Sequence, residues 1–316
     1  MSARRAVGID IGGTKIAALR ITSAGAIEAT TVIPSPATDQ DEALPAIEAA
    51  AAAVLDDAVV AIGIGMAGLV DVRTGVLLAT PNLVWRNLPL GERLIGTFGL
   101  PVTVDNDATA AAWGEARLGA SRGYDHSLFV GVGTGIGGGI VSGGRLVRGA
   151  HGLAGEIGHV IVEPDGPLCG CGNRGCWEQV ASGPAISRAG ARAVVDEPGS
   201  AIARLAGGDP RRATGELVTE AARAGDEAAV AILAEVGRRL GEGVAGLVNV
   251  LDPEIVVIGG GAGEAGELLL VPLRRAFVAS VEGVDVRPEV PIVPAALGND
   301  AGAIGAALLA LEAAPG

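Results

Sequence analysis

The chain has 316 residues, a length that predicts about two domains, and its formal net charge is −13 at pH 7. Lys15 is the one lysine among 23 basic residues and no basic face is evident, which argues against a nucleic-acid-binding protein. No apolar run reaches the roughly 18 residues of a membrane span, and the opening residues lead into a strand pattern without a signal-peptide core. We therefore expect a cytoplasmic protein whose cysteines stay reduced.

The first pattern, at residues 5–33, is three short apolar strands separated by tight turns. Asp10 ends the first strand, and the turn after it contains Gly12, Gly13, Thr14 and Lys15. The backbone amides of such a turn can approach a phosphate closely, and the aspartate can hold a magnesium ion through water. An ordinary hairpin with an exposed aspartate explains these residues equally well. No Walker sequence is present, so the turn is not a P-loop.

A helix is predicted over residues 39–55 and a buried strand over 59–66. Gly68 follows this strand, where the absence of a side chain lets a ligand come close. Residues 81–90 form an irregular loop that leads into a helix at about 90–98. Its Asn82 and Trp85 either face a pocket or belong to a surface loop that is packed by one tryptophan.

Residues 101–119 contain a short strand that ends in Asp105, Asn106 and Asp107, and an alanine-rich helix starts at once. Helix capping alone would explain an aspartate at this position. Capping does not require the two polar neighbours, however, and an amide beside a carboxylate is also how a pair of sugar hydroxyls is bound. Both interpretations stay open at this point.

Residues 127–149 contain a formal dinucleotide-binding match at Gly133, Gly135 and Gly138. That fingerprint must open a helix, whereas here the glycines continue into a strand, a second glycine turn and another strand, so we reject it. The segment repeats the arrangement of the N-terminal hairpin. It predicts an internally duplicated protein with one phosphate-binding hairpin in each half and a nucleotide held between the domains.

All the cysteines lie in residues 156–178, together with a histidine and a glutamate at each end: His159, Cys169, Cys171 and Cys176, with Glu156 and Glu178 at the ends. Three thiolates and an imidazole form the Cys3His ligand set of a structural zinc site, which leaves no coordination position for substrate water. Free cysteines beside an unrelated histidine are the alternative, but their grouping within eight positions favours zinc.

Helical patterns follow from about 184 to 250, with an interruption near 207–210. A buried strand at 255–258 is followed by Gly259, Gly260 and a further helix. This arrangement suits the adenosine part of a nucleotide or is only a tight strand-to-helix turn. The last strand, at 291–293, leads to a closing helix at 301–311, which we expect to pack on the first domain.

Six motifs in order carry a resemblance that covers essentially the whole chain: DIGGTK at 10–15, DNDATAAAWGE at 105–115, GVGTGIGGGI at 131–140, HGLAGEIGH at 151–159, CGCGNRGCWE at 169–178 and VVIGGG at 256–261. Together they resemble the ROK family, named for repressors, open reading frames and kinases, and within it the bacterial ATP-dependent glucokinases.

The resemblance implies an α/β protein with the actin-like ATPase (ribonuclease-H-like) fold, in which two α/β domains surround a central cleft. Residues 1–112 with 301–316 would form the small domain, and residues 113–300 the large domain with the zinc motif at 159–176. The implied activity is phosphorylation of the 6-hydroxyl of glucose by magnesium-ATP, with a structural zinc ion and a homo-oligomer, either dimer or tetramer.

The resemblance also assigns roles to single residues. Asp107 corresponds to the general base, and the sugar ligands correspond to Gly68, Asn82, Asn106, Asp107, Glu156, His159 and Glu178. The nucleotide and magnesium motifs match Asp10, Gly12, Gly13, Thr14, Lys15, Gly133, Thr134, Gly135, Gly259 and Gly260. Because His159 is also in the zinc set with Cys169, Cys171 and Cys176, it would join the metal site to the sugar site.

Three alternatives stay open. Another kinase of the family would act on N-acetylglucosamine, N-acetylmannosamine, fructose or allose, although the CWE and PNLVW stretches favour glucose. A sugar-sensing repressor would carry a helix-turn-helix domain ahead of the first strand, and only nine residues precede Asp10. A polyphosphate donor is disfavoured because the related polyphosphate enzymes lack the zinc cysteines.

Overall fold

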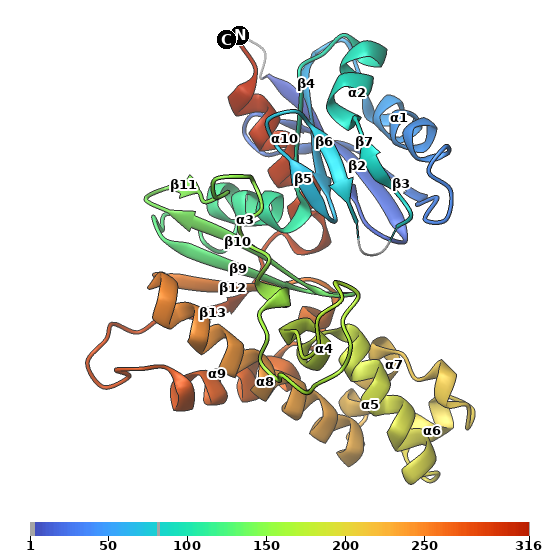
Figure 1. Cartoon of the computed structure of the whole chain (residues 1–316), viewed down its shortest axis with the longest axis vertical. Helices are drawn as coiled ribbons and strands as arrows, with labels where there is room; N and C mark the ends of the chain where they lie inside the picture. The colour runs from blue at the N-terminus through green and yellow to red at the C-terminus, as the bar shows by residue number, and fades with distance from the viewer. Residues whose placement is uncertain (1–3, 81–82, 316) are drawn as a thin grey trace. The chain divides into compact units, whose positions relative to one another are not determined.

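The computed structural model describes residues 4–80 and 83–315, and Figure 1 labels their helices and strands. The chain divides into two compact units. The first consists of Met1–Phe129, Gly138–Gly155 and Ala295–Gly316, and the second of Val130–Gly137 and Glu156–Pro294. The domain bounds that the sequence predicts, 1–112 with 301–316 and 113–300, divide the chain at other points and stay a prediction.

The first unit contains a five-stranded sheet in the order β3-β2-β1-β4-β8. Its strands are β1 (Arg5–Ile11), β2 (Lys15–Thr22), β3 (Ile27–Pro34), β4 (Val59–Met66) and β8 (Val102–Asn106). The first three strands pair antiparallel, whereas β1, β4 and β8 are parallel. Strand β4, which lies between β1 and β8, is buried on both faces, as its continuous apolar sequence predicts.

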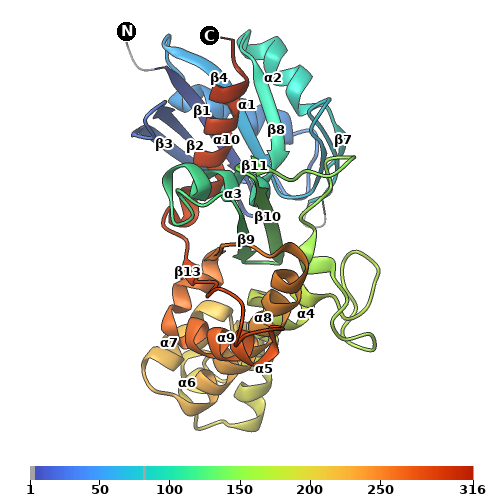
Figure 2. The same ribbon diagram turned by 90° about the vertical axis from the view of Figure 1, so that its left-hand side faces the viewer.

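A helix on this sheet closes the first unit. Figures 1 and 2 show α10 (Ala301–Ala313) running beside β1 and β4. A Cβ atom built on Gly8 would lie 1.9 Å from the carbonyl oxygen of Ala303, and one on Gly63 would lie 1.8 Å from that of Ala306. The helix and the strands therefore touch backbone to backbone, which explains why glycine is needed at these two strand positions. The closing helix packs on the first unit, as the sequence predicted.

Further elements of this unit are α1 (Ala43–Val54), α2 (Leu90–Phe98), α3 (Asp107–Leu118) and a three-stranded sheet of β5 (Leu69–Asp71), β6 (Val76–Ala79) and β7 (Arg86–Leu88). One expectation is corrected here, and one open alternative is decided. The helix begins at Ala43 rather than at 39, because the Asp39 side chain accepts the amide of Asp41 and holds a turn before it. Trp85 does not face a pocket, since its ring is fully buried and its Nε1 donates to the oxygen of Pro36 at 3.2 Å.

A second five-stranded sheet has the order β11-β10-β9-β12-β13. Its strands are β9 (Ser127–Val132), β10 (Ile136–Ser142), β11 (Arg145–Leu146), β12 (Ile255–Gly259) and β13 (Ile292–Pro294). Counted along the chain, this order repeats that of the first sheet: third, second, first, fourth, fifth. The internal duplication inferred from the two glycine hairpins is therefore present in the sheet topology.

The second unit holds β12, β13 and parts of β9 and β10 from this sheet, and its other elements are helical. It contains α4 (Trp177–Ala181), α5 (Gly183–Asp196), α6 (Ala201–Leu205), α7 (Gly215–Arg223), α8 (Glu227–Leu251) and α9 (Glu267–Ser280), with the short 3₁₀ turns η1 (Ile157–His159), η2 (Pro210–Arg212) and η3 (Gly261–Ala265). The predicted helical region is thus broken at more points than its sequence indicated. Within the residues that the structure describes, no helix has the length and apolar character needed to cross a bilayer.

Candidate active site

The end of β8 brings together three of the predicted site residues in the first unit. Asn106 caps α3, because its Oδ1 accepts the amide of Thr109 at 3.0 Å. Its Nδ2 donates to the carbonyl oxygen of Gly68 at 3.3 Å, which ties the predicted sugar loop to the strand end. Asp107 is the first residue of α3, and its Oδ1 accepts the amide of Ala108 at 2.9 Å.

A second carboxylate, that of Asp10, lies near the end of β1 in the same sheet. Asp10 lies on β1 opposite Gly65 of β4, and the start of α10 lies against it: a Cβ on Gly302 would be 3.0 Å from the carboxylate carbon. Burial, followed by the nearby Asp107 carboxylate, raises the pKa of Asp10 to about 7, although Lys15 lowers it. Burial also raises the pKa of Asp107 above its ordinary value. A carboxylate with increased proton affinity is suited to accept a proton from a hydroxyl.

The first glycine turn joins β1 to β2. The amide of Gly12 donates to the oxygen of Lys15 at 3.0 Å, while the side chains of Thr14 and Lys15 are exposed. Gly13 lies in the bend between Gly12 and Thr14. This turn therefore presents backbone and short polar groups directly after Asp10.

The second glycine turn joins β9 to β10 and lies against the third glycine cluster. The amide of Gly133 donates to the oxygen of Gly135 at 2.9 Å, and Thr134 between them is exposed. A Cβ on Gly260 would lie 2.5 Å from the oxygen of Val132, so the turn that follows Gly259 packs directly beside this hairpin. The second unit thus brings together all the predicted nucleotide-binding glycines that it contains, and a glycine turn of this kind suits an anionic ligand.

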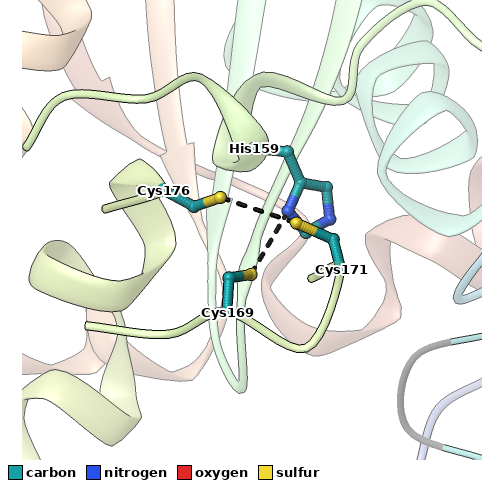
Figure 3. A group of neighbouring side chains, drawn as sticks. All are labelled: His159, Cys169, Cys171 and Cys176. Atoms are coloured by element: carbon teal, nitrogen blue, oxygen red, sulfur yellow. Dashed lines mark hydrogen bonds between the residues drawn. The ribbon is translucent and has the colours of Figure 1, made fainter. Parts of the chain in front are cut away.

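Four side chains converge in the second unit, as Figure 3 shows: His159, Cys169, Cys171 and Cys176. Their ligand atoms all lie within 4.8 Å of one another. The Sγ atoms of Cys171 and Cys176 are 3.6 Å apart, and Cys169 Sγ is 3.6 Å from His159 Nδ1. Zinc bond lengths of about 2.3 Å to sulfur and about 2.05 Å to nitrogen require tetrahedral edges of about 3.8 and 3.6 Å. The cluster therefore fits a tetrahedral zinc ion.

The two glutamates of this segment flank the cluster. His159 Nε2 is 3.8 Å from Glu156 Oε2, and its Nδ1 is 3.9 Å from Glu178 Oε1. A carboxylate near the free ring nitrogen is the usual outer-shell partner of a metal-bound histidine. Burial raises the pKa of the Cys169 thiol to about 12, and this thiol donates to Glu178 Oε1 at 3.0 Å.

Glu178 also touches the second glycine turn. A Cβ on Gly135 would lie 2.5 Å from Glu178 Oε2, so the carboxylate lies against the backbone of the hairpin. The position of Glu178 on α4 is fixed by its neighbour Trp177, which is buried and donates through Nε1 to the oxygen of Arg239 at 3.0 Å. Glu178, a predicted sugar-binding residue, and Gly135, a predicted nucleotide-binding residue, are thus in contact within the second unit.

The structure therefore assembles the predicted residues in two groups, one in each unit, and Asn82 lies outside the described residues. One residue near the site was not predicted. The Nε atom of Arg148 donates to Asp105 Oδ2 at 2.7 Å across 43 positions of sequence. An arginine in a loop carries no local signal that would identify this partner.

The comparisons with known proteins agree with one another. A family model described as ROK family matches residues 6–313. A glucokinase of Streptomyces coelicolor is 42% identical over 311 residues, 98% of each chain, and an N-acetylmannosamine kinase of Escherichia coli is 38% identical over 306 residues, 96% of this chain and 97% of the relative. The crystal structure of a ROK family glucokinase from Streptomyces griseus in complex with glucose and AMPPNP superposes with a TM-score of 0.91 at 43% identity, covering 98% of this chain and 99% of that one.

Proposed function

The chain belongs to the ROK family, and from that premise we propose that it is a glucokinase, which transfers the γ-phosphoryl group of ATP to the 6-hydroxyl of glucose. Its fold is the actin-like ATPase fold. The observation that carries the proposal is the likeness over essentially the full length to a glucokinase whose structure holds glucose and AMPPNP. The two glycine hairpins and the carboxylates beside them supply the groups that this reaction needs.

Asp107 is the general base in this proposal. A sugar hydroxyl is a weak nucleophile at neutral pH, so a carboxylate within hydrogen-bond reach must accept its proton as the phosphoryl group transfers. Asp107 is held at the start of α3, and burial raises its pKa, which increases its affinity for that proton. Asn106 beside it would bind a neighbouring hydroxyl with the side-chain amide groups that its bonds to Thr109 and Gly68 do not use.

The remaining sugar ligands in the proposal are Gly68, Asn82, Glu156, His159 and Glu178. Carboxylates that accept bidentate hydrogen bonds from hydroxyls orient the sugar, and they reject analogues that lack those hydroxyls because buried acceptors would then be unpaired. Since Glu178 lies against Gly135, its orientation depends on the same hairpin that would bind the phosphates.

The nucleotide would be bound by the glycine turns, at Gly12, Gly13, Thr14 and Lys15 in the first hairpin, Gly133, Thr134 and Gly135 in the second, and Gly259 and Gly260 on the adenosine side. Asp10 would hold a magnesium ion through water, and the ion would supply neutralisation of charge on the phosphates. Preorganised amides in a site from which water is excluded stabilise the charge of the transition state and limit ATP hydrolysis.

His159, Cys169, Cys171 and Cys176 would hold a structural zinc ion. Four protein ligands complete its tetrahedron, so the ion would supply folding free energy and no Lewis-acid chemistry. Its ligands span the segment between Glu156 and Glu178, and the cross-link would fix the two glutamates relative to each other. We further propose that the protein acts in the cytoplasm as a homo-oligomer, either a dimer or a tetramer.

A second candidate is a kinase of N-acetylmannosamine or of another sugar. It is favoured by the 38% identity to the Escherichia coli N-acetylmannosamine kinase over 96% of this chain. Fold, base and zinc site would be shared between the two candidates, and the residues around the sugar 2-position would differ. A regulator that binds sugar without turnover is the third candidate.

The test is an ADP-release assay of purified protein with magnesium-ATP and a panel of sugars: glucose, N-acetylglucosamine, N-acetylmannosamine, mannose and fructose. We expect glucose to give the largest kcat/KM. A larger value for an N-acetyl sugar would overturn the assignment of glucose but keep the kinase. No sugar-dependent ADP release with any of the five would remove the kinase proposal in favour of a binding role.

A further inference from the structure

The Asp105 carboxylate is buried directly before the two residues on which the proposed chemistry depends. Its side chain is only 7% exposed, and each of its oxygens has one donor. Oδ1 accepts the backbone amide of Asn106 at 2.9 Å, and Oδ2 accepts Nε of Arg148 at 2.7 Å. A buried carboxylate is stable only when its oxygens are paired in this way.

Arg148 is itself held in place by its backbone. The preceding residue, Val147, donates its amide to the oxygen of Ile140 on β10 at 2.8 Å. The oxygen of Arg148 accepts the amide of Ala154 at 3.1 Å, which closes the loop that leads by sequence into Glu156. The guanidinium therefore extends from a fixed backbone position to the end of β8, within the first compact unit.

We infer that Arg148 is a positioning residue for phosphoryl transfer: through Asp105 it fixes the end of β8, where Asn106 and Asp107 begin the helix that carries the base. The inference rests on the proposed function, since it concerns the placement of its base and of one of its sugar ligands. Within the part of the chain that the structure describes, the Arg148 side chain bonds to Asp105 and not to Asn106 or Asp107.

The physical reason is the cost of a buried charge without a partner. Burial raises the pKa of Asp105, and the Arg148 charge is the strongest influence that lowers it. When the guanidinium is removed, the carboxylate must take up a proton or turn toward water, and either change weakens its bond to the Asn106 amide. Asn106 and Asp107 then lose a restraint at the point where β8 becomes α3, and a displacement of about 1 Å in a reacting group costs about 100-fold in rate.

An ion pair that served stability alone would behave differently. Its loss would lower the melting temperature but would leave the kinetics of the folded enzyme unchanged. The matched control is Arg145→Ala, because Arg145 lies three positions away on β11 and its side chain is exposed. The Arg145→Ala change removes one positive charge from the same segment and leaves the pair of Arg148 with Asp105 in place.

The experiment compares Arg148→Ala, Arg148→Lys and Arg145→Ala with the wild-type protein at a temperature at which all are folded. For each, kcat and the KM values for glucose and for magnesium-ATP are measured, with and without added guanidinium chloride at a low, non-denaturing concentration. Hydrogen exchange of the peptide that covers 102–110 is followed by mass spectrometry. The Arg148→Ala change is also made in an Asp105→Asn background, in which position 105 carries no charge.

We expect Arg148→Ala to lower kcat/KM for glucose by about 100-fold, with the KM for magnesium-ATP within about twofold of wild type. Guanidinium and Arg148→Lys should each restore part of the loss, exchange in 102–110 should accelerate, and the same change in the Asp105→Asn background should cost much less. Kinetics and exchange that match those of Arg145→Ala would overturn the inference. If Arg148→Ala does not fold, Arg148→Lys decides by the same measurements.

Failure of the proposed function would look different from failure of this inference. A wild-type protein that phosphorylates no sugar refutes the kinase and, with it, the role of Arg148 in turnover. An active wild type with an equally active Arg148→Ala variant refutes only the positioning role.

Discussion

Replacement of Gly305 by alanine tests whether the backbone contact between α10 and α3 is as close as the structure has it. A Cβ at this position would lie 1.7 Å from the carbonyl oxygen of Ala110 and 3.0 Å from the amide nitrogen of Gly114. The two helices would have to separate by roughly 1.5 Å to restore a normal van der Waals distance, and a backbone carbonyl cannot turn away as a flexible side chain can.

The magnitude follows from two opposed effects. Alanine favours a helix over glycine by about 1 kcal/mol, whereas overpacking costs about 1–3 kcal/mol, and the clash with backbone places this site at the upper end. The control is Gly96→Ala inside α2, where a Cβ would meet nothing within 4 Å, so only the gain of about 1 kcal/mol applies. For Gly305→Ala, an overpacking cost of about 3 kcal/mol less a helix gain of about 1 kcal/mol leaves a net destabilisation of about 2 kcal/mol.

Scanning calorimetry of the two variants under identical conditions measures this difference. At about 2–4 °C per kcal/mol, we expect the Tm to fall by about 4–8 °C for Gly305→Ala and to rise by about 2–4 °C for Gly96→Ala. Activity should fall as well, because Gly302 on the same helix lies against the Asp10 carboxylate. A Tm of Gly305→Ala equal to or above that of wild type would refute the contact geometry.

Three further predictions concern the site. Asp107→Asn should lower kcat by several orders of magnitude while glucose still binds, as kinetics and calorimetric titration can measure, and retained turnover would remove Asp107 from the role of base. Cys171→Ser should reduce zinc below one ion per chain by elemental analysis and lower the Tm, whereas a wild-type protein without stoichiometric zinc would exclude the metal site. The pKa of Asp10 is raised to about 7 in the folded protein, whereas an unfolded aspartate has a pKa of about 4. The folded state is therefore destabilised progressively as the pH rises from about 4 to about 7, and the loss of stability is complete above pH 7. In EDTA, Asp10→Asn should therefore gain more stability over wild type at pH 8 than at pH 5, and an equal difference at both pH values would contradict the raised pKa.

The sequence by itself predicted most of the elements and the four side chains of the His/Cys cluster. The strand at 59–66 and the helix at 90–98 lie where the apolar pattern placed them, because hydrophobic periodicity and glycine turns act over a few neighbouring residues. The grouping of the three cysteines and His159 predicted a four-ligand cluster for the same reason, since ligands close in sequence need only a short loop to meet.

Tertiary structure decided what depends on residues far apart in the chain. The burial of Trp85 against Pro36, the contact of Glu178 with Gly135 and the pair of Arg148 with Asp105 have no local signature, because each joins segments that the fold alone brings together. The same holds for the pKa of Asp10, which depends on burial and on Asp107, 97 positions away. Local sequence thus fixes which chemical groups are present, whereas packing sets the partners and charges that decide how those groups behave.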